Sequence, residues 1–262
     1  MHLGYIKGAP TGTCSRAFVE GGTHKFKADG VVFYNTGLLP GYAALFRHPN
    51  DELNYCCYII PGNPNVTNDD LKHWHEHLMY NDRNLSRALG TNFKIENMKA
   101  GSLRLGGEPV TSDKHLIIVG DAAGMIDPLT GEGIHHAMDG GRIAARVLLE
   151  AIKQGNYSAD AMHVYHEEWM HAFGDDFIWS MRICQLLYRF PILIDAATAA
   201  VARKGDAFLA RWADIMTGRV PKTNLFRPEF VIVITFELFV LLGKKLMGMP
   251  IVPKEAGSSK KD

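Results

Sequence analysis

The sequence predicts an α/β fold of the α+β type, in which an antiparallel sheet precedes a strand-loop-helix segment and an α-helical C-terminal tail. Three observations predict this order. Residues 31–60 hold β-branched and aromatic runs separated by turn residues, an apolar run at 116–119 leads straight into Gly-Asp, and the chain after Ile134 is mostly helical in pattern. We therefore expect three segments: a sheet domain with one helix at 1–110, a strand-loop-helix at 111–155 and a helical region at 156–262.

The composition describes a globular, electrically balanced chain. It has 262 residues with 47% hydrophobic content, enough for one large or two modest cores. Lys plus Arg and Asp plus Glu both number 28, so the net charge is zero, which argues against a nucleic-acid partner and favours association with other proteins.

Four cysteines without framework spacing predict free thiols and an intracellular setting. The N-terminus lacks an apolar core and has one Arg in its first twenty residues, which argues against a secretory signal. An organelle such as a mitochondrion or plastid stays open as the compartment.

The first segment reads as an antiparallel meander. Its strands are expected at Val31–Asn35, Ala43–His48 and Leu53–Ile60. Pro61–Pro64 interrupts it, and Thr67 or Asn68 is expected to cap a helix with its apolar face at Leu71, Trp74, Leu78 and Leu85. A further strand is expected at Ile95–Leu105.

The segment 115–138, HLIIVGDAAGMIDPLTGEGIHHAM, is the most informative stretch of the chain. Leu116–Val119 is a short apolar run typical of a strand covered on both faces. Gly120 and Asp121 turn the chain at its end. Gly131 and Gly133 precede the helix that begins at Ile134, so backbone N–H groups there can approach a ligand closely.

This run, from Gly120-Asp121-Ala122-Ala123-Gly124 through Asp127-Pro128-Leu129-Thr130-Gly131-Glu132-Gly133-Ile134, resembles the geranylgeranyl reductase family of FAD-dependent oxidoreductases. The resemblance implies a partial FAD-binding, flavoprotein-monooxygenase-like fold with FAD as cofactor. It implies that Asp121 binds a ribityl hydroxyl and that the helix start lies beside the flavin pyrimidine edge. The implied cofactor-binding residues are Gly120, Asp121, Pro128, Gly131, Glu132, Gly133 and Ile134.

The chemistry of these residue types suits that assignment. Reduction places negative charge on the N1–C2=O edge of a flavin, and a helix N-terminus carries about half a positive charge. An ionised Asp121 only accepts hydrogen bonds, so it suits a polyol better than a phosphate.

The segment Pro40-Gly41-Tyr42-Ala43-Ala44-Leu45-Phe46 resembles the family's Pro-Gly-Tyr segment, whose aromatic side chains line an isoprenoid pocket. Tyr42 and Phe46 are the candidate substrate residues. Ala44 and Arg47 depart from the family pattern, as do Cys56-Cys57 further on. An ordinary role for Tyr42 and Phe46 in a sheet core has equal weight.

A Gly-x-Gly-x-x-Gly turn after an apolar strand, which binds the FAD diphosphate, does not occur in this sequence. The resemblance covers the later half of a family member. We expect a second chain carrying the N-terminal dinucleotide-binding half, or else a descendant that has lost the flavin.

Other candidate sites have weaker support from the sequence. His73 with His77 and His163 with His166 have helical pair spacing but no further ligands, so no metal site is predicted and solvated helix faces are expected. His135 and His136 lie in the helix expected to begin beside the flavin. Because adjacent residues of a helix point in different directions, only one of the two can face the flavin. The apolar helix expected at 229–247 is too short to span a bilayer, and either faces a protein partner or lies in a membrane surface.

The favoured function is an FAD-dependent oxidoreductase that reduces isoprenoid C=C bonds as one half of a split protein, with no catalytic residue assigned. Its substrate would be a lipid or isoprenoid, and a membrane surface or larger complex would be a further partner. The alternative is a catalytically inactive accessory subunit of a membrane-associated complex. A halogenase-like or hydroxylase-like flavoenzyme is a weaker third interpretation.

Overall fold

A computed structural model of the chain describes residues 11–24, 26, 28–60 and 66–249. These residues form two units, Met1–Arg189 and Phe190–Asp262. The predicted boundaries after residues 110 and 155 both fall inside the first unit, and the three-segment division stays a prediction. The expected break at Pro61–Pro64 lies outside the described residues.

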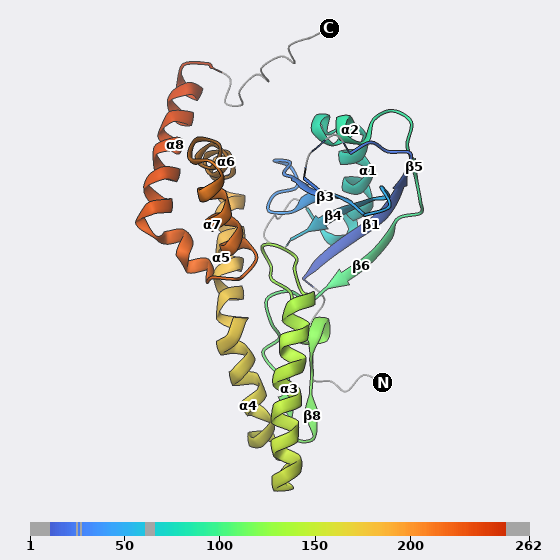
Figure 1. The fold of residues 1–262 in the computed structure, drawn as a ribbon, viewed down its shortest axis with the longest axis vertical. Helices are drawn as coiled ribbons and strands as arrows, with labels where there is room; N and C mark the ends of the chain where they lie inside the picture. Colours follow the sequence, from blue (N-terminus) through green and yellow to red (C-terminus); the bar gives the residue numbers. More distant parts are fainter. Residues whose placement is uncertain (1–10, 25, 27, 61–65, 250–262) are drawn as a thin grey trace. The chain divides into compact units, whose positions relative to one another are not determined.

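An antiparallel sheet opens the first unit (Figure 1), and within the described residues its strand order is β2-β3-β4-β1-β5, with β6 also pairing β1. The predicted meander is confirmed as β2 (Gly30–Phe33), β3 (Tyr42–Arg47) and β4 (Leu53–Ile59). Cys57 points into the core and Cys56 to the other face, as expected for neighbours on a strand.

Strand β1 (Gly12–Glu20) lies between β4 and β6 and was not predicted. Its inward face consists of Thr13, Ser15, Ala17 and Val19, all buried. Two of these four side chains are polar, so hydrophobic alternation does not reveal the strand. The expected strand at 95–105 is split into β5 (Lys94–Ile95) and β6 (Lys99–Leu103), which pair with successive parts of β1.

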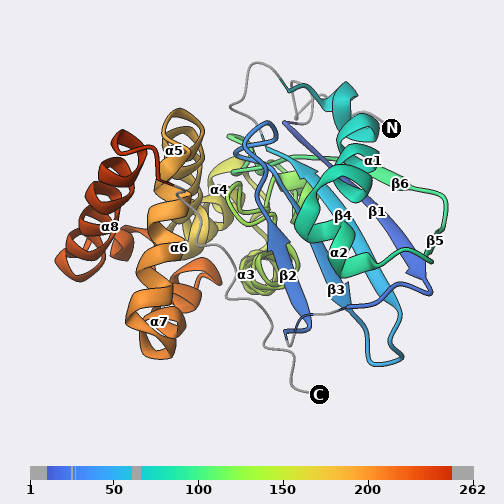
Figure 2. The ribbon, with the colours of Figure 1, turned by 90° about the horizontal axis from the view of Figure 1, so that it is seen from above.

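Helices α1 (Leu71–Asn81) and α2 (Arg83–Leu89) cover one face of the sheet (Figure 2). A 3₁₀ turn, η1 (Asn68–Asp70), precedes them with Thr67 at its N-cap, as predicted. The single expected helix is divided at Asp82, whose carboxylate accepts hydrogen bonds from the amides of Asn84 and Leu85, both at 3.0 Å. Such a cap starts a new helix.

The strand expected at 116–119 is shorter and less covered than predicted. Strand β8 comprises only Leu116–Ile117 and pairs with β7 (Ser112–Asp113) in a separate two-stranded sheet. Its residues are half-buried and Val119 is 42% exposed. Burial on both faces needs layers on both sides, and the described residues supply one, through α4.

Helix α3 (Ile134–Gln154) begins at the predicted residue and ends at Gly155 in the left-handed conformation. It packs against α4 (Ala159–Trp169) (Figure 1). A π-helical turn, η3 (Met170–Gly174), carries the helix through Gly174 into α5 (Asp175–Arg189).

The second unit consists of α6 (Ile192–Lys204), α7 (Asp206–Met216), a 3₁₀ segment η4 (Lys222–Phe226) and α8 (Pro228–Leu246). Its core contains Ala200, Phe208, Ile215 and Phe230. Among the described residues no single helix has the length and hydropathy to cross a bilayer, and one interrupted pair, Ala159–Arg189 with Ile192–Lys204, meets that test by length and composition.

Candidate functional site

The loop between η2 (Gly120–Ala123) and α3 is held by the buried carboxylate of Asp127. This carboxylate accepts hydrogen bonds from the amide of Leu129 at 2.8 Å, the amide of Thr130 at 3.2 Å and the hydroxyl of Ser180 at 3.0 Å. Several donors to one buried carboxylate fix its geometry and the backbone around it. The loop is therefore set in place before any ligand arrives.

Gly131 lets this loop lie directly on the sheet. Its φ is +71°, and a Cβ built on it would lie 3.0 Å from both Tyr42 Oη and Tyr58 Cε1. The Tyr42 hydroxyl also donates to the carbonyl oxygen of Thr130. A side chain at position 131 would thus be strained by the backbone and would push the loop off the two tyrosines.

The N-terminus of α3 is free to bind an acceptor. Its N-cap is Gly133, and no side chain in the described part of the chain makes a capping hydrogen bond there. The first N–H groups of a helix have no partner within the helix, and they carry the positive end of its dipole. This arrangement fits the electron-rich edge of a planar ring or another anionic group.

The predicted cofactor residues lie together around this N-terminus, at differing depths. Asp121, Glu132 and Ile134 are exposed, Gly120, Gly131 and Gly133 are half-buried, and Pro128 is buried. Among the described residues no hydrogen-bond donor reaches the Asp121 carboxylate. An exposed, unpaired acceptor beside free amides suits a ligand that has both hydroxyls and acceptor atoms.

The two predicted substrate residues are separated along β3. Tyr42 contacts the loop, while Phe46 lies four residues further, ~13 Å at the rise of a strand, and is 43% exposed. Tyr42 packs edge to face with Tyr34 and Tyr58, with ring centroids 6.1 Å and 5.2 Å apart. The structure brings Tyr42, and not Phe46, to the loop.

Sequence reasoning missed Tyr58, Cys14 and Cys56, which share the Tyr42 face of the sheet. Tyr58 is paired with Tyr42 across β3 and β4 and with Cys14 across β1 and β4. Burial raises the pKa of Tyr58, and its hydroxyl has no hydrogen-bond partner among the described residues. Hydrogen bonding with the Cys14 thiol, followed by burial, raises the pKa of Cys56. The missing information was the pairing of β1 with β4, which the sequence does not show because half of the inward face of β1 is polar.

The two histidines at the start of α3 point in different directions, as expected. His136 is buried between the rings of Phe173 and Phe177, with centroids 4.9 Å and 4.8 Å away, while His135 is exposed. His166 was expected on a solvated helix face and instead turns inward, with Nδ1 2.8 Å from the Thr111 hydroxyl. His75, for which the sequence predicts no position, is buried.

Comparison with known proteins gives relatives but no matching family model. The chain is 50% identical over 249 residues to conditioned medium factor receptor 1 of Dictyostelium discoideum, covering 93% of this chain and 48% of that protein. It is 35% identical over 144 residues to digeranylgeranylglycerophospholipid reductase of Methanococcus vannielii, covering 52% of this chain and 34% of the relative.

Among solved structures, a geranylgeranyl bacteriochlorophyll reductase-like protein from Thermoplasma acidophilum matches with a TM-score of 0.57 at 20% identity. The match covers 95% of this chain and 57% of that one, and it shows a shared fold. The chain thus spans about half the length of its Dictyostelium relative, and smaller shares of the archaeal reductases.

Proposed function

We propose that this chain, which belongs to the geranylgeranyl reductase family of FAD-dependent oxidoreductases, is the flavin-contacting and substrate-side half of such an enzyme. The observation that carries the proposal is the uncapped N-terminus of α3, with Gly131 and Gly133 on one side and the unpaired carboxylate of Asp121 on the other. FAD offers both the electron-rich edge and the hydroxyls that these groups suit.

Each site residue has a role toward the flavin. Asp121 would accept hydrogen bonds from the ribityl chain, and the amides at the start of α3 would stabilise charge on the pyrimidine edge. Asp127 and Ser180 hold the loop, and Tyr42 supports it from the sheet. When bound, the flavin supplies the hydride for reduction of a double bond.

The substrate proposed is an isoprenoid or lipid with C=C bonds, in keeping with the names of the archaeal relatives. Tyr42 and its neighbours Tyr34 and Tyr58 form the aromatic wall that would face it. The diphosphate of FAD needs a dinucleotide-binding half, and we propose that this half is a second polypeptide or a further part of a longer protein.

Flavin absorption tests this proposal directly. The chain co-purified with its native partners should show visible flavin absorption that dithionite bleaches. Asp121→Ala should weaken flavin binding about 10- to 100-fold, because a hydrogen bond to a charged group contributes about 1.5–3 kcal/mol. Asp69→Ala, which changes an exposed carboxylate on η1, is the matched control and should bind flavin normally. A colourless preparation that contains every partner would refute the proposal.

A second candidate follows from the Dictyostelium relative, whose name is that of a receptor. On this alternative the chain is a catalytically inactive descendant that keeps the fold as an accessory or binding subunit of a membrane-associated complex. It predicts a stable, colourless protein in which Asp121→Ala changes neither absorption nor assembly.

We also infer attachment to a membrane surface through α8. Its outward side presents Ile232, Phe236, Phe239 and Leu246 at helical spacing, between 51% and 89% exposed. Its polar residue Glu237 is buried and pairs with Arg203 of α6, and Lys244 and Lys245 follow in the last turn. An apolar face bordered by lysines is typical of helices that lie in an interface.

A further inference from the structure

Two half-buried cysteines, Cys14 of β1 and Cys56 of β4, are neighbours on the sheet face that carries Tyr42. Arg16 lies opposite Cys56 in the pairing of β1 with β4, so Cys14 is one diagonal step from Cys56 and is on the same face. The Cys56 thiol donates a hydrogen bond to the Cys14 sulfur. Both cysteines are free, so the two strands carry a dithiol at this point.

The four cysteines differ in their reactivity. Cys57 and Cys184 are buried, and burial raises the pKa of each thiol to about 12, which keeps both protonated and inert. The hydrogen bond from Cys56 instead lowers the pKa of Cys14. Because the thiolate is the nucleophilic form of cysteine, Cys14 is the thiol that reacts first.

A small molecule can reach the dithiol from the side of β6. Gly101 of β6 lies opposite Cys14 on the other side of β1 and is exposed. A Cβ built on Gly101 would meet no described atom within 4 Å, so no side chain in the described part of the chain closes this approach. Thiol oxidation depends on access as well as on thiolate character. Hydrogen peroxide is little larger than water and needs only a narrow path of this kind.

We propose that Cys14 and Cys56 are a peroxide-reactive dithiol that closes to a reversible disulfide between β1 and β4. The Cys14 thiolate attacks hydrogen peroxide: an S–O bond forms, the O–O bond breaks, and the departing hydroxide takes up the proton that Cys14 has lost. The Cys56 sulfur then attacks the sulfenic acid of Cys14, and its proton leaves with the hydroxyl as a second water. Two thiols are oxidised and one peroxide is reduced. The reaction needs no flavin, so it goes beyond the proposed function.

Closure of the disulfide is transmitted to the loop before α3. Diagonal neighbours of an antiparallel pair lie about 7–8 Å apart, and a disulfide usually joins Cα atoms no more than about 6.8 Å apart, so β1 and β4 must shift locally. Tyr58 lies opposite Cys14, and its ring lies against Gly131. Tyr42 lies opposite Tyr58 and donates a hydrogen bond to the carbonyl oxygen of Thr130. Oxidation therefore disturbs the surface on which this loop rests.

Mass spectrometry of the full chain, with any native partner bound, tests the dithiol. After hydrogen peroxide the wild type should lose two hydrogen atoms, give a cross-linked peptide pair that contains Cys14 and Cys56, and recover its mass with dithiothreitol. Cys56→Ser should stop at the sulfenic acid of Cys14, which dimedone traps, and Cys14→Ser should form neither product. Cys57→Ala, which removes the neighbouring thiol on the opposite face, is the matched control and should cross-link like the wild type.

Hydrogen exchange of the reduced and oxidised wild type tests the link to the loop and needs no variant. Amides of residues 129–134 should exchange faster in the oxidised chain, while those of residues 145–154 near the end of α3 should not change. Thiols that stay reduced in peroxide, or a Cys14 sulfinic acid without a cross-link, would overturn the dithiol proposal. A disulfide that forms without changing exchange in residues 129–134 would overturn its transmission to the loop.

Discussion

His75 shows how one residue of α1 changes meaning when the sheet is in place. It lies four residues after Leu71 and three before Leu78, which puts it on the buried side of the helix. Its Nδ1 lies 2.7 Å from Ser15 Oγ of β1, and its ring is 4.6 Å from that of Tyr55. Burial lowers the pKa of His75 to about 4.

We predict that the His75 side chain makes folding sensitive to mild acid. Its pKa is below the usual 6.5, so the unfolded chain takes up the proton first, and stability is full above pH 6.5 and falls toward pH 4. By linkage, about 2 kcal/mol is lost at pH 5. The free energy of unfolding is measured with urea at pH 7 and at pH 5. The difference between the two pH values should be smaller in His75→Asn than in the wild type. His77→Asn, at an exposed position of the same helix, is the control and should show the wild-type difference. An equal loss in both variants would contradict the prediction.

At the scale of elements, a buried hydroxyl joins the hairpin β7-β8 to α4. The Trp169 indole N–H donates to Thr111 Oγ1 at 2.8 Å, and the His166 Nδ1 lies 2.8 Å from the same oxygen. Thr111 and Trp169 are both fully buried. This junction holds the hairpin whose second strand, β8, ends four residues before Asp121.

Replacing Thr111 by Val should therefore destabilise the first unit by about 1–3 kcal/mol, because the Trp169 N–H is left buried without an acceptor. Denaturant unfolding followed by tryptophan fluorescence measures the change. Thr91→Val, at an exposed loop position, is the control and should alter stability by less than about 0.5 kcal/mol. No difference between the two variants would show that the junction contributes little.

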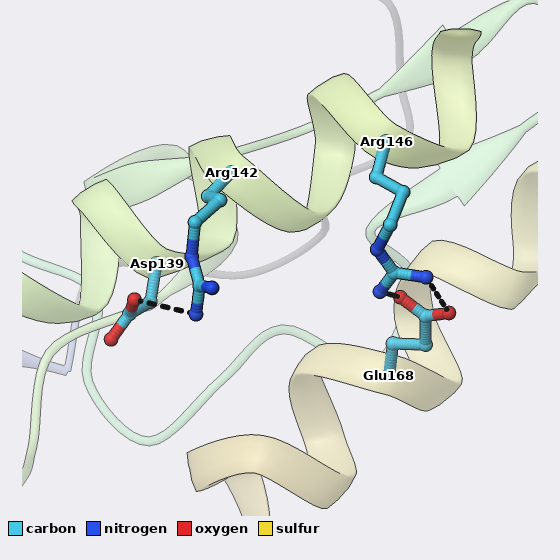
Figure 3. Close-up of polar contacts among 4 residues, drawn as sticks. All are labelled: Asp139, Arg142, Arg146 and Glu168. Carbon is cyan, nitrogen blue, oxygen red and sulfur yellow. Dashed lines mark hydrogen bonds and ion pairs between the residues drawn. The ribbon is translucent and has the colours of Figure 1, made fainter.

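At the scale of the whole molecule, the chain forms two units that each present an apolar surface. The first unit exposes Ile134, Met138, Leu149 and Ile152 along α3. The second has the outward side of α8, whose inner side packs on α6. The two surfaces differ in the charges beside them. Arg142 and Arg146 beside the exposed side of α3 pair with carboxylates (Figure 3), whereas Lys244 and Lys245 in the last turn of α8 have no ion-pair partner among the described residues.

This difference predicts that α8, and not α3, binds lipid. Phe239→Asp should reduce co-flotation of the chain with vesicles of phosphatidylcholine and phosphatidylglycerol at least several-fold, because a charge replaces a 70% exposed aromatic ring. Ala210→Asp on α7 adds the same charge at an exposed position and should float like the wild type. Flotation that neither substitution reduces, or that Ala145→Arg on α3 abolishes, would reject α8 as the anchor.

The sequence by itself determined the antiparallel meander, the start of α3 at Ile134 and the resemblance to the geranylgeranyl reductases, because those features depend on local patterns of turn residues, glycines and apolar runs. Only the tertiary structure revealed β1, whose inward face is half polar, and the burial of His75, since both follow from contacts between distant segments. It also decided that Tyr42 lies against the loop before α3 while Phe46 does not. Periodicity tells which side of an element is apolar, but only packing tells which apolar sides find a partner.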